Sequence, residues 1–140
     1  MKRFWLCLIL CVVFTGCNVL PMTASGSPVP DTLPEDFGGK TRYGYMMDLK
    51  NTYMPSTIFS DAVKYSNSDR ENARRAAELL ISAATQAMET AGAPDQYNLY
   101  LRAYSYDLKY QDTKDATFKQ LALADYQKTI ENGGGYAQAD

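Results

Sequence analysis

The sequence predicts an all-α protein, a small bundle of antiparallel helix hairpins. Three consecutive segments, 68–91, 95–111 and 113–131, carry apolar residues at helical spacing between capping residues, proline or glycine. The 140 residues suffice for one modest core. Apolar residues make up 46% and charged residues 21%, which is typical of a folded domain and unlike a disordered chain. We therefore expect one helical domain over residues 41–140.

The clearest helix is predicted to begin at Ser68. Ser68 and Glu71 have the spacing of a capping box, and Gly92 and Pro94 end the apolar pattern. The stripe consists of Ala73, Ala76, Leu80, Ala83, Ala87 and Ala91, widened by Leu79, Ile81, Ala84 and Met88. Small residues let another helix backbone come close, so packing alone explains this composition.

The segment 95–111 contains polar residues at spacings of four, three and four. They are Asn98, Arg102, Ser105 and Lys109. This pattern predicts one narrow exposed stripe on a helix that lies between neighbouring helices.

Five of the eleven tyrosines also lie in this segment. Tyr100, Tyr106 and Tyr110 could line a peptide-binding groove, because tyrosine offers flat contact area, a hydroxyl and little entropy to lose. Arg102 and Lys109 would then contribute to the same partner-binding face. Alternatively the tyrosines belong to the core with their hydroxyls at the surface.

The last helix is predicted over 113–131, opened by Asp112 or Thr113 and closed by Asn132 and the glycines at 133–135. Its predicted buried stripe is Phe118, Leu121, Ala122, Tyr126 and Ile130. The short break around Asp112 predicts an antiparallel hairpin.

Between residues 41 and 67 a helix is favoured over a short strand. Apolar residues occur at helical spacing on both sides of Pro55, which interrupts whatever forms. They are Met46, Leu49 and Tyr53 before it, and Ile58 or Phe59 with Ala62 and Val63 after it.

The N-terminus has the form of a secretory signal, with Lys2 and Arg3 before an apolar run over residues 4–14. As a helix, this run covers roughly 16 Å, about half of a bilayer's hydrocarbon layer. The sequence over 13–17 resembles the lipobox of bacterial lipoproteins. The resemblance implies that residues 1–16 are removed and that Cys17 is lipidated, with palmitate among its acyl chains. An unlipidated secreted protein cut near Ala24 is the alternative.

Asn18 follows the cysteine where an aspartate would, by the same resemblance, retain a lipoprotein at the inner membrane, so we expect the outer membrane. Residues 17–40 are rich in proline, glycine and serine, which predicts a flexible linker between bilayer and domain. The alternative is an arm in which Leu33 and Phe37 fold back on the domain.

Two stretches resemble a tetratricopeptide hairpin over about residues 95–132. They are Leu101-Arg102-Ala103 with Tyr106, and the run from Ala122 to Ile130 that contains Asp125, Tyr126 and Lys128. The separation of Ala103 and Ala122 exceeds the family's regular spacing, so one degenerate hairpin is expected, packed on the helix at Ser68. The resemblance implies a protein-binding module.

Composition excludes several function classes. The chain has no histidine, which rules out histidine-based triads and histidine-ligated metals. A formal charge of −2 gives no electrostatic reason to bind nucleic acid. After signal removal only Cys17 remains, and one cysteine builds no zinc site. We expect no cofactor and no metal.

Three hypotheses follow for an envelope protein on the periplasmic face of the membrane. The first is an outer-membrane-anchored scaffold or adaptor that binds another envelope protein, and the second is a pilotin-like chaperone of a secretion or pilus assembly. The third, a carboxylate-dependent enzyme, is disfavoured because no pair of acids has a spacing that dictates a shared cleft. Its candidate acids are Glu71, Glu78, Asp107 and Asp125. The oligomeric state stays open.

Overall fold

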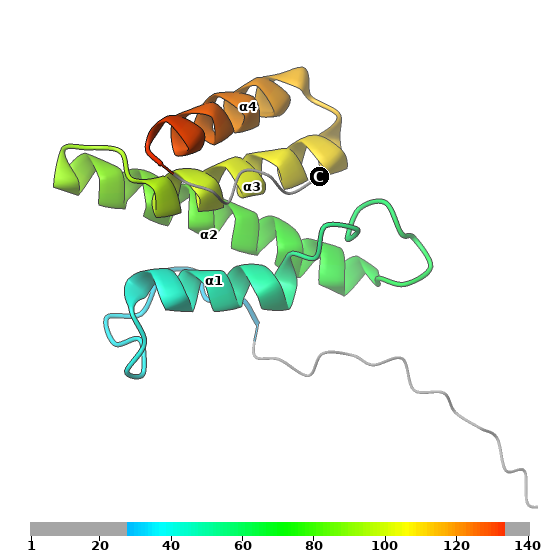
Figure 1. Cartoon of the computed structure of the whole chain (residues 1–140). Coiled ribbons are helices and arrows are strands. Elements are labelled where there is room, and N and C mark those ends of the chain that lie inside the picture. The colour runs from blue at the N-terminus through cyan, green and yellow to red at the C-terminus, as the bar shows by residue number, and fades with distance from the viewer. Residues whose placement is uncertain (1–27, 134–140) are drawn as a thin grey trace, which may run out of the picture.

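A computed structural model describes residues 28–133, which form four helices and, within that range, no strand (Figure 1). In chain order these are α1 (Arg42–Tyr53), α2 (Asn67–Ala91), α3 (Gln96–Thr113) and α4 (Ala116–Glu131). The predicted all-α class is confirmed.

The helices form a small bundle in which α3 is central. It packs on α2 and on α4, while α1 lies mainly on α2 and touches α3 (Figure 1). Short turns join α2 to α3 and α3 to α4, so these neighbours run antiparallel. The predicted hairpin and its packing partner are therefore present, whereas membership of the tetratricopeptide family stays a prediction.

Every helix begins at a residue whose side chain accepts a hydrogen bond from a backbone amide of the first turn. These N-cap residues are Thr41, Ser66, Asp95 and Asp115. In α2 the amide of Asp69 donates to Ser66 Oγ at 3.1 Å, and the amide of Ser66 donates to Asp69 Oδ2 at 2.8 Å. The capping box predicted at Ser68 and Glu71 is wrong, because Ser66 and Asp69 meet the same spacing rule two residues earlier.

The predicted start of the last helix is also wrong. Helix α3 continues through Asp112 and Thr113, and α4 begins after Asp115. The hydroxyl of Thr113 donates back to the carbonyl of Lys109 at 2.8 Å, so it does not cap a new helix. Lys114 makes the break with a left-handed φ of 60°.

Residues 54–66 form turns, so the helix expected after Pro55 is absent. Ile58 is buried, whereas Val63 is 99% exposed and Ala62 is exposed as well. Met54 and Ile58 are both buried, and Phe59 and Tyr65 pack against the core, so these side chains hold the connection on the bundle.

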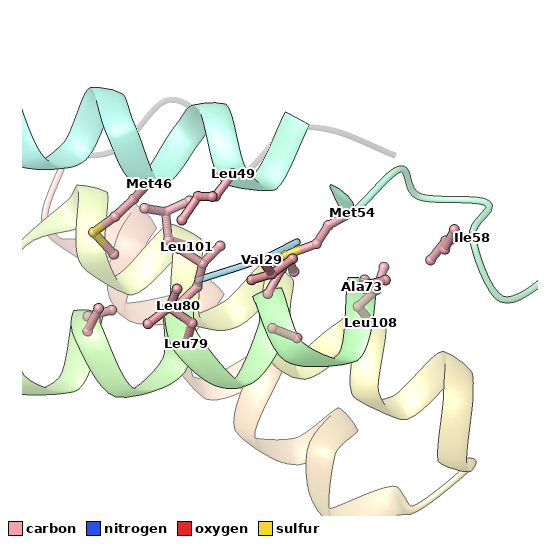
Figure 2. Close-up of a cluster of buried hydrophobic side chains, with 14 residues drawn as sticks. Val29, Met46, Leu49, Met54, Ile58, Ala73, Leu79, Leu80, Leu101 and Leu108 are labelled. Atoms are coloured by element: carbon pink, nitrogen blue, oxygen red, sulfur yellow. The ribbon is translucent and has the colours of Figure 1, made fainter. Parts of the chain in front are cut away.

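The core lies between α1, α2 and α3 (Figure 2). Leu80 and Leu101 are its centre, and Val29, which precedes α1, inserts into it with 2% of its surface exposed. Leu33 packs against the same cluster, and Asp31 pairs with Arg75 of α2 at 2.6 Å. Over residues 28–40, which we call the arm, the chain thus follows the fold-back alternative and does not stand free as a tether.

Helix α4 buries only part of the stripe predicted for it, since Ala122 is buried and Phe118 and Tyr126 are half-buried. Ala122, Asp125 and Thr129 are buried, whereas Leu121 and Ile130 are 40% and 53% exposed. The fully buried positions in its contact with α3 are small or polar, and the aromatic side chains of Phe118 and Tyr126 lie beside them. The larger side chains of α4 are therefore left at its flanks.

Candidate functional site

The predicted polar stripe of α3 does not face water. Ser105 is fully buried and donates to its own helix, to the carbonyl of Leu101 at 2.8 Å. Lys109 forms an ion pair with Glu78 of α2. Asn98 donates to Asp95 at 2.7 Å, so each member of the stripe has a partner within the protein.

Arg102 is the centre of this stripe. Its Nε and Nη2 donate to the two carboxylate oxygens of Asp125 in α4 at 2.6 and 2.9 Å, and its Nη1 donates to Thr85 Oγ1 in α2 at 3.0 Å. The hydrogen bonds to Asp125 raise the pKa of Arg102. A residue predicted to bind a partner instead joins three helices of the bundle.

Tyr106 and Tyr110 lie toward the start of α4. The ring of Tyr106 stacks on Phe118 with centroids 6.3 Å apart, and Lys109 Nζ lies 4.8 Å from the centroid of the same Phe118 ring. Tyr110 lies beneath the ammonium groups of Lys114 and Lys119, at 5.9 and 5.6 Å. Both tyrosines are half-buried and hold the hairpin together.

Tyr100 belongs to another group of aromatic rings. Its ring lies 6.3 Å from that of Tyr104 on the same helix and 6.4 Å from that of Tyr126 on α4. Lys50 of α1 places its ammonium 4.2 Å from the Tyr104 centroid and 5.8 Å from the Tyr100 centroid. We call Lys50, Tyr100, Tyr104 and Tyr126 the tyrosine cluster.

Burial sets the electrostatics of the tyrosine cluster. It raises the pKa of Tyr104 to about 12, raises those of Tyr100 and Tyr126, and lowers that of Lys50. Tyr104 also donates its hydroxyl to the carbonyl of Met54 at 2.7 Å. Among the described residues no carboxylate forms an ion pair with Lys50. The cluster therefore presents neutral phenols beside one desolvated cation.

Two large aliphatic side chains border Tyr126 on α4. Leu123 precedes it by three residues and Ile130 follows it by four, so all three lie on one side of the helix. Leu123 is 58% and Ile130 53% exposed. We call Leu123, Tyr126 and Ile130 the α4 face. Helical spacing alone does not reveal this face, because it places Tyr126 and Ile130 on the stripe predicted to be buried.

The five predicted binding residues therefore do not form one surface. Tyr100 is in the tyrosine cluster and Arg102 is in an interhelical ion pair. Tyr106, Lys109 and Tyr110 gather around the first turn of α4. Only Tyr100 lies beside the exposed apolar side chains of the α4 face.

The four candidate acids are also dispersed among separate partners. Glu71 lies 3.4 Å from Arg74, Glu78 pairs with Lys109, and Asp107 accepts from Gln111 at 3.1 Å. Asp125, expected on a solvated face, is buried against Arg102. In the part of the chain that the structure describes, no group of three or more acids or cysteines could hold a metal ion.

Cys17 and residues 1–16 lie outside the described residues, so lipid attachment stays a prediction. None of the helices within residues 28–133 has the length and hydropathy to cross a bilayer. No protein-family model, curated protein or solved structure matches this chain.

Proposed function

We propose that this protein is a lipid-anchored adaptor of the bacterial envelope. Cys17 carries the lipid that attaches it to the outer membrane, and the helical body binds another envelope protein. The observation that supports binding is the α4 face, where Leu123 and Ile130 are each more than half exposed beside Tyr126. Burying an aliphatic side chain of this size contributes about 1.5–3 kcal/mol.

The tyrosine cluster gives this surface its polar component. Tyr126 connects the α4 face to Tyr100, and Tyr100 lies beneath Lys50. Tyrosine is one of the residue types that concentrate binding energy at interfaces, and here tyrosines adjoin exposed aliphatic side chains. A partner segment with an apolar stripe and a carboxylate for Lys50 would complement this surface.

Site-specific photocrosslinking tests the binding surface. A photoreactive residue in place of Leu123 should yield a discrete crosslinked protein in intact cells. The same residue in place of exposed Glu71 on α2 should not. The double variant L123S/I130S should lose the partner at an unchanged melting temperature, because both side chains are exposed. If the photoreactive residue yields the same crosslinked proteins at positions 123 and 71, the proposal is overturned.

The anchor has a separate test. The variant Cys17→Ser should lose labelled-palmitate incorporation and move from the membrane fraction to the soluble fraction, because Cys17 is the proposed attachment residue. Several acyl chains, each contributing about 0.8 kcal/mol per buried methylene, make attachment effectively permanent. Continued palmitate labelling of the serine variant would refute the lipobox assignment.

A further inference from the structure

A pocket of about 640 Å³ lies between the arm, the start of α1 and the middle of α2. The arm contributes Leu33 and Phe37, α1 contributes Arg42, and α2 contributes Leu79 and Ala83. This volume is within the range of small-molecule and peptide sites. The wall mixes these apolar side chains with polar and charged ones. Besides Arg42, the polar lining residues are Asp31, Thr32, Arg75, Glu78, Ser82 and Gln86.

Arg42 is incompletely satisfied by the protein. Its Nη2 donates to the carbonyl of Ala83 at 2.9 Å, while its Nε is buried without a hydrogen-bond partner. Among the described residues no carboxylate pairs with Arg42. By contrast, Arg74 and Arg102 each direct the Nε and Nη2 edge at a carboxylate. A buried donor left without an acceptor is costly, and a carboxylate is the acceptor that best fits this edge.

The remaining charges around the pocket are compensated. Arg75 pairs with Asp31 at 2.6 Å, and Glu78 pairs with Lys109. The charged lining residues are therefore two arginines and two acids, and Arg42 is the one among them without an ion-pair partner within residues 28–133. Asp31 and Glu78 also line the pocket, and their carboxylates would repel a second negative charge on the ligand. The pocket therefore favours a singly charged anion over a phosphate with two charges.

We propose that this pocket binds the carboxylate of an amphipathic ligand, such as a peptide C-terminus with an apolar last residue. The carboxylate approaches the guanidinium of Arg42, and the apolar group packs on Leu33, Phe37 and Leu79. Occupancy supplies the guanidinium of Arg42 with a carboxylate, which it lacks among the described residues, and it holds the arm against the helices. The pocket lies on α1, α2 and the arm, so the inference does not depend on the α4 face.

Titration of the full chain with two matched probes tests this inference. N-acetyl-L-phenylalanine carries the carboxylate, and N-acetyl-L-phenylalanine amide differs only in having none. The acid should shift the amide resonances of Phe37 and Ala83 saturably. The amide should bind at least about tenfold more weakly, because it lacks the charge-assisted hydrogen bonds. Equal affinity of the two probes, or no saturable shift with the acid, would overturn the proposal without any variant.

Variants locate the contact. Arg42→Gln should weaken the acid at least about tenfold and leave the amide unchanged, whereas Arg42→Lys should retain part of the preference for the acid. Arg74→Gln is the matched control, because Arg74 lies on α2 outside this pocket and pairs with Asp112. Binding that survives in Arg42→Gln, or that is lost equally in Arg74→Gln, would contradict the assignment.

Discussion

At the scale of single residues, the ion pair of Arg102 and Asp125 determines how α4 sits on the bundle. Their side chains are only 20% and 5% exposed, and both carboxylate oxygens accept from the guanidinium. Thr129, one turn further along α4, donates to the carbonyl of Asp125 at 2.8 Å. Desolvating two charges is expensive, so we expect this pair to contribute more to the register of α4 than to net stability.

Removing one partner of the pair should be strongly destabilising. Asp125→Ala leaves the guanidinium of Arg102 without its carboxylate, and we expect a loss of about 3 kcal/mol in the free energy of unfolding. Arg75→Ala is the control, because its pair with Asp31 is exposed and should contribute about 1 kcal/mol or less. Urea denaturation of both variants measures the difference. Equal urea midpoints for Asp125→Ala and Arg75→Ala would show that the buried pair is dispensable.

The tyrosine cluster should make the protein sensitive to alkali. Below the ordinary tyrosine pKa the phenols are protonated in both folded and unfolded chains, so they add no pH dependence. Above it the unfolded chain loses its protons first, because burial raises the pKa of Tyr104 to about 12 and raises those of Tyr100 and Tyr126. The free energy of unfolding should therefore fall from about pH 10 to about pH 12.

Lys50 contributes with the opposite sign, because burial lowers its pKa and the folded chain releases that proton first. Within the tyrosine cluster Lys50 opposes three tyrosines, so the free energy of unfolding should still fall as the pH rises. Urea midpoints across this pH range, with tyrosinate absorbance of the native protein, measure both effects. The prediction fails if all native tyrosines titrate together at their ordinary pKa.

The polar stripe of α3 shows why residue roles were only partly predictable. Spacings of four, three and four place polar residues on one side of a helix, but the pattern is the same whether that side meets water or polar groups of other helices. The binding role predicted for Tyr100 stays a prediction. The sequence pattern placed Arg102 and Lys109 on an exposed stripe, whereas both form ion pairs with other helices. Their partners Asp125 and Glu78 lie 23 and 31 residues away, and local spacing carries no information on such contacts.

At the scale of elements, the helix ends depend on backbone conformation as much as on capping side chains. Gly92 ends α2 at a φ of 69°, and Lys114 ends α3 at a φ of 60°. Both lie in the left-handed region, which suits glycine and costs other residues roughly 1–2 kcal/mol. The existence of α2, α3 and α4 was predictable from periodicity. Their exact starts were not, because Ser66 with Asp69 and Ser68 with Glu71 both have the spacing of a capping box at the start of α2.

Exchanging the residue types at these two ends should change stability in opposite directions. Lys114→Gly should raise the free energy of unfolding by about 1 kcal/mol, because it relieves the left-handed strain. Gly92→Ala should lower it by a similar amount, although an added Cβ would meet no atom within 4 Å. Thermal unfolding of the two variants provides the measurement. Changes of the same sign would show that φ does not control these ends.

At the scale of the whole molecule, the described helices contribute unequally to the core. The main hydrophobic cluster draws on the arm, α1, the turn after it, α2 and α3, and it includes no residue of α4. Helix α4 therefore has apolar side chains left over, and the proposed binding surface consists of them. A sequence pattern shows which residues are apolar on a helix. It does not show how many neighbouring helices are present to cover them, which is why the α4 face was missed.

The arm provides the last prediction. Val29 is 2% exposed in the core and Val63 is 99% exposed in the turn after α1, so the two valines form a matched pair. Val29→Ala removes buried methyl groups and should cost about 1.5–3 kcal/mol, whereas Val63→Ala should change stability by about 0.5 kcal/mol or less.

Urea denaturation of the two valine variants, together with a chain that begins at Lys40, measures what the arm contributes. The shortened chain should stay helical by circular dichroism and should be destabilised at least as much as Val29→Ala, because it loses Val29, Leu33 and the ion pair of Asp31 with Arg75. If Val29→Ala and the shortened chain are as stable as Val63→Ala, residues 28–40 are a free tether, and the pocket around Arg42 loses one of its walls.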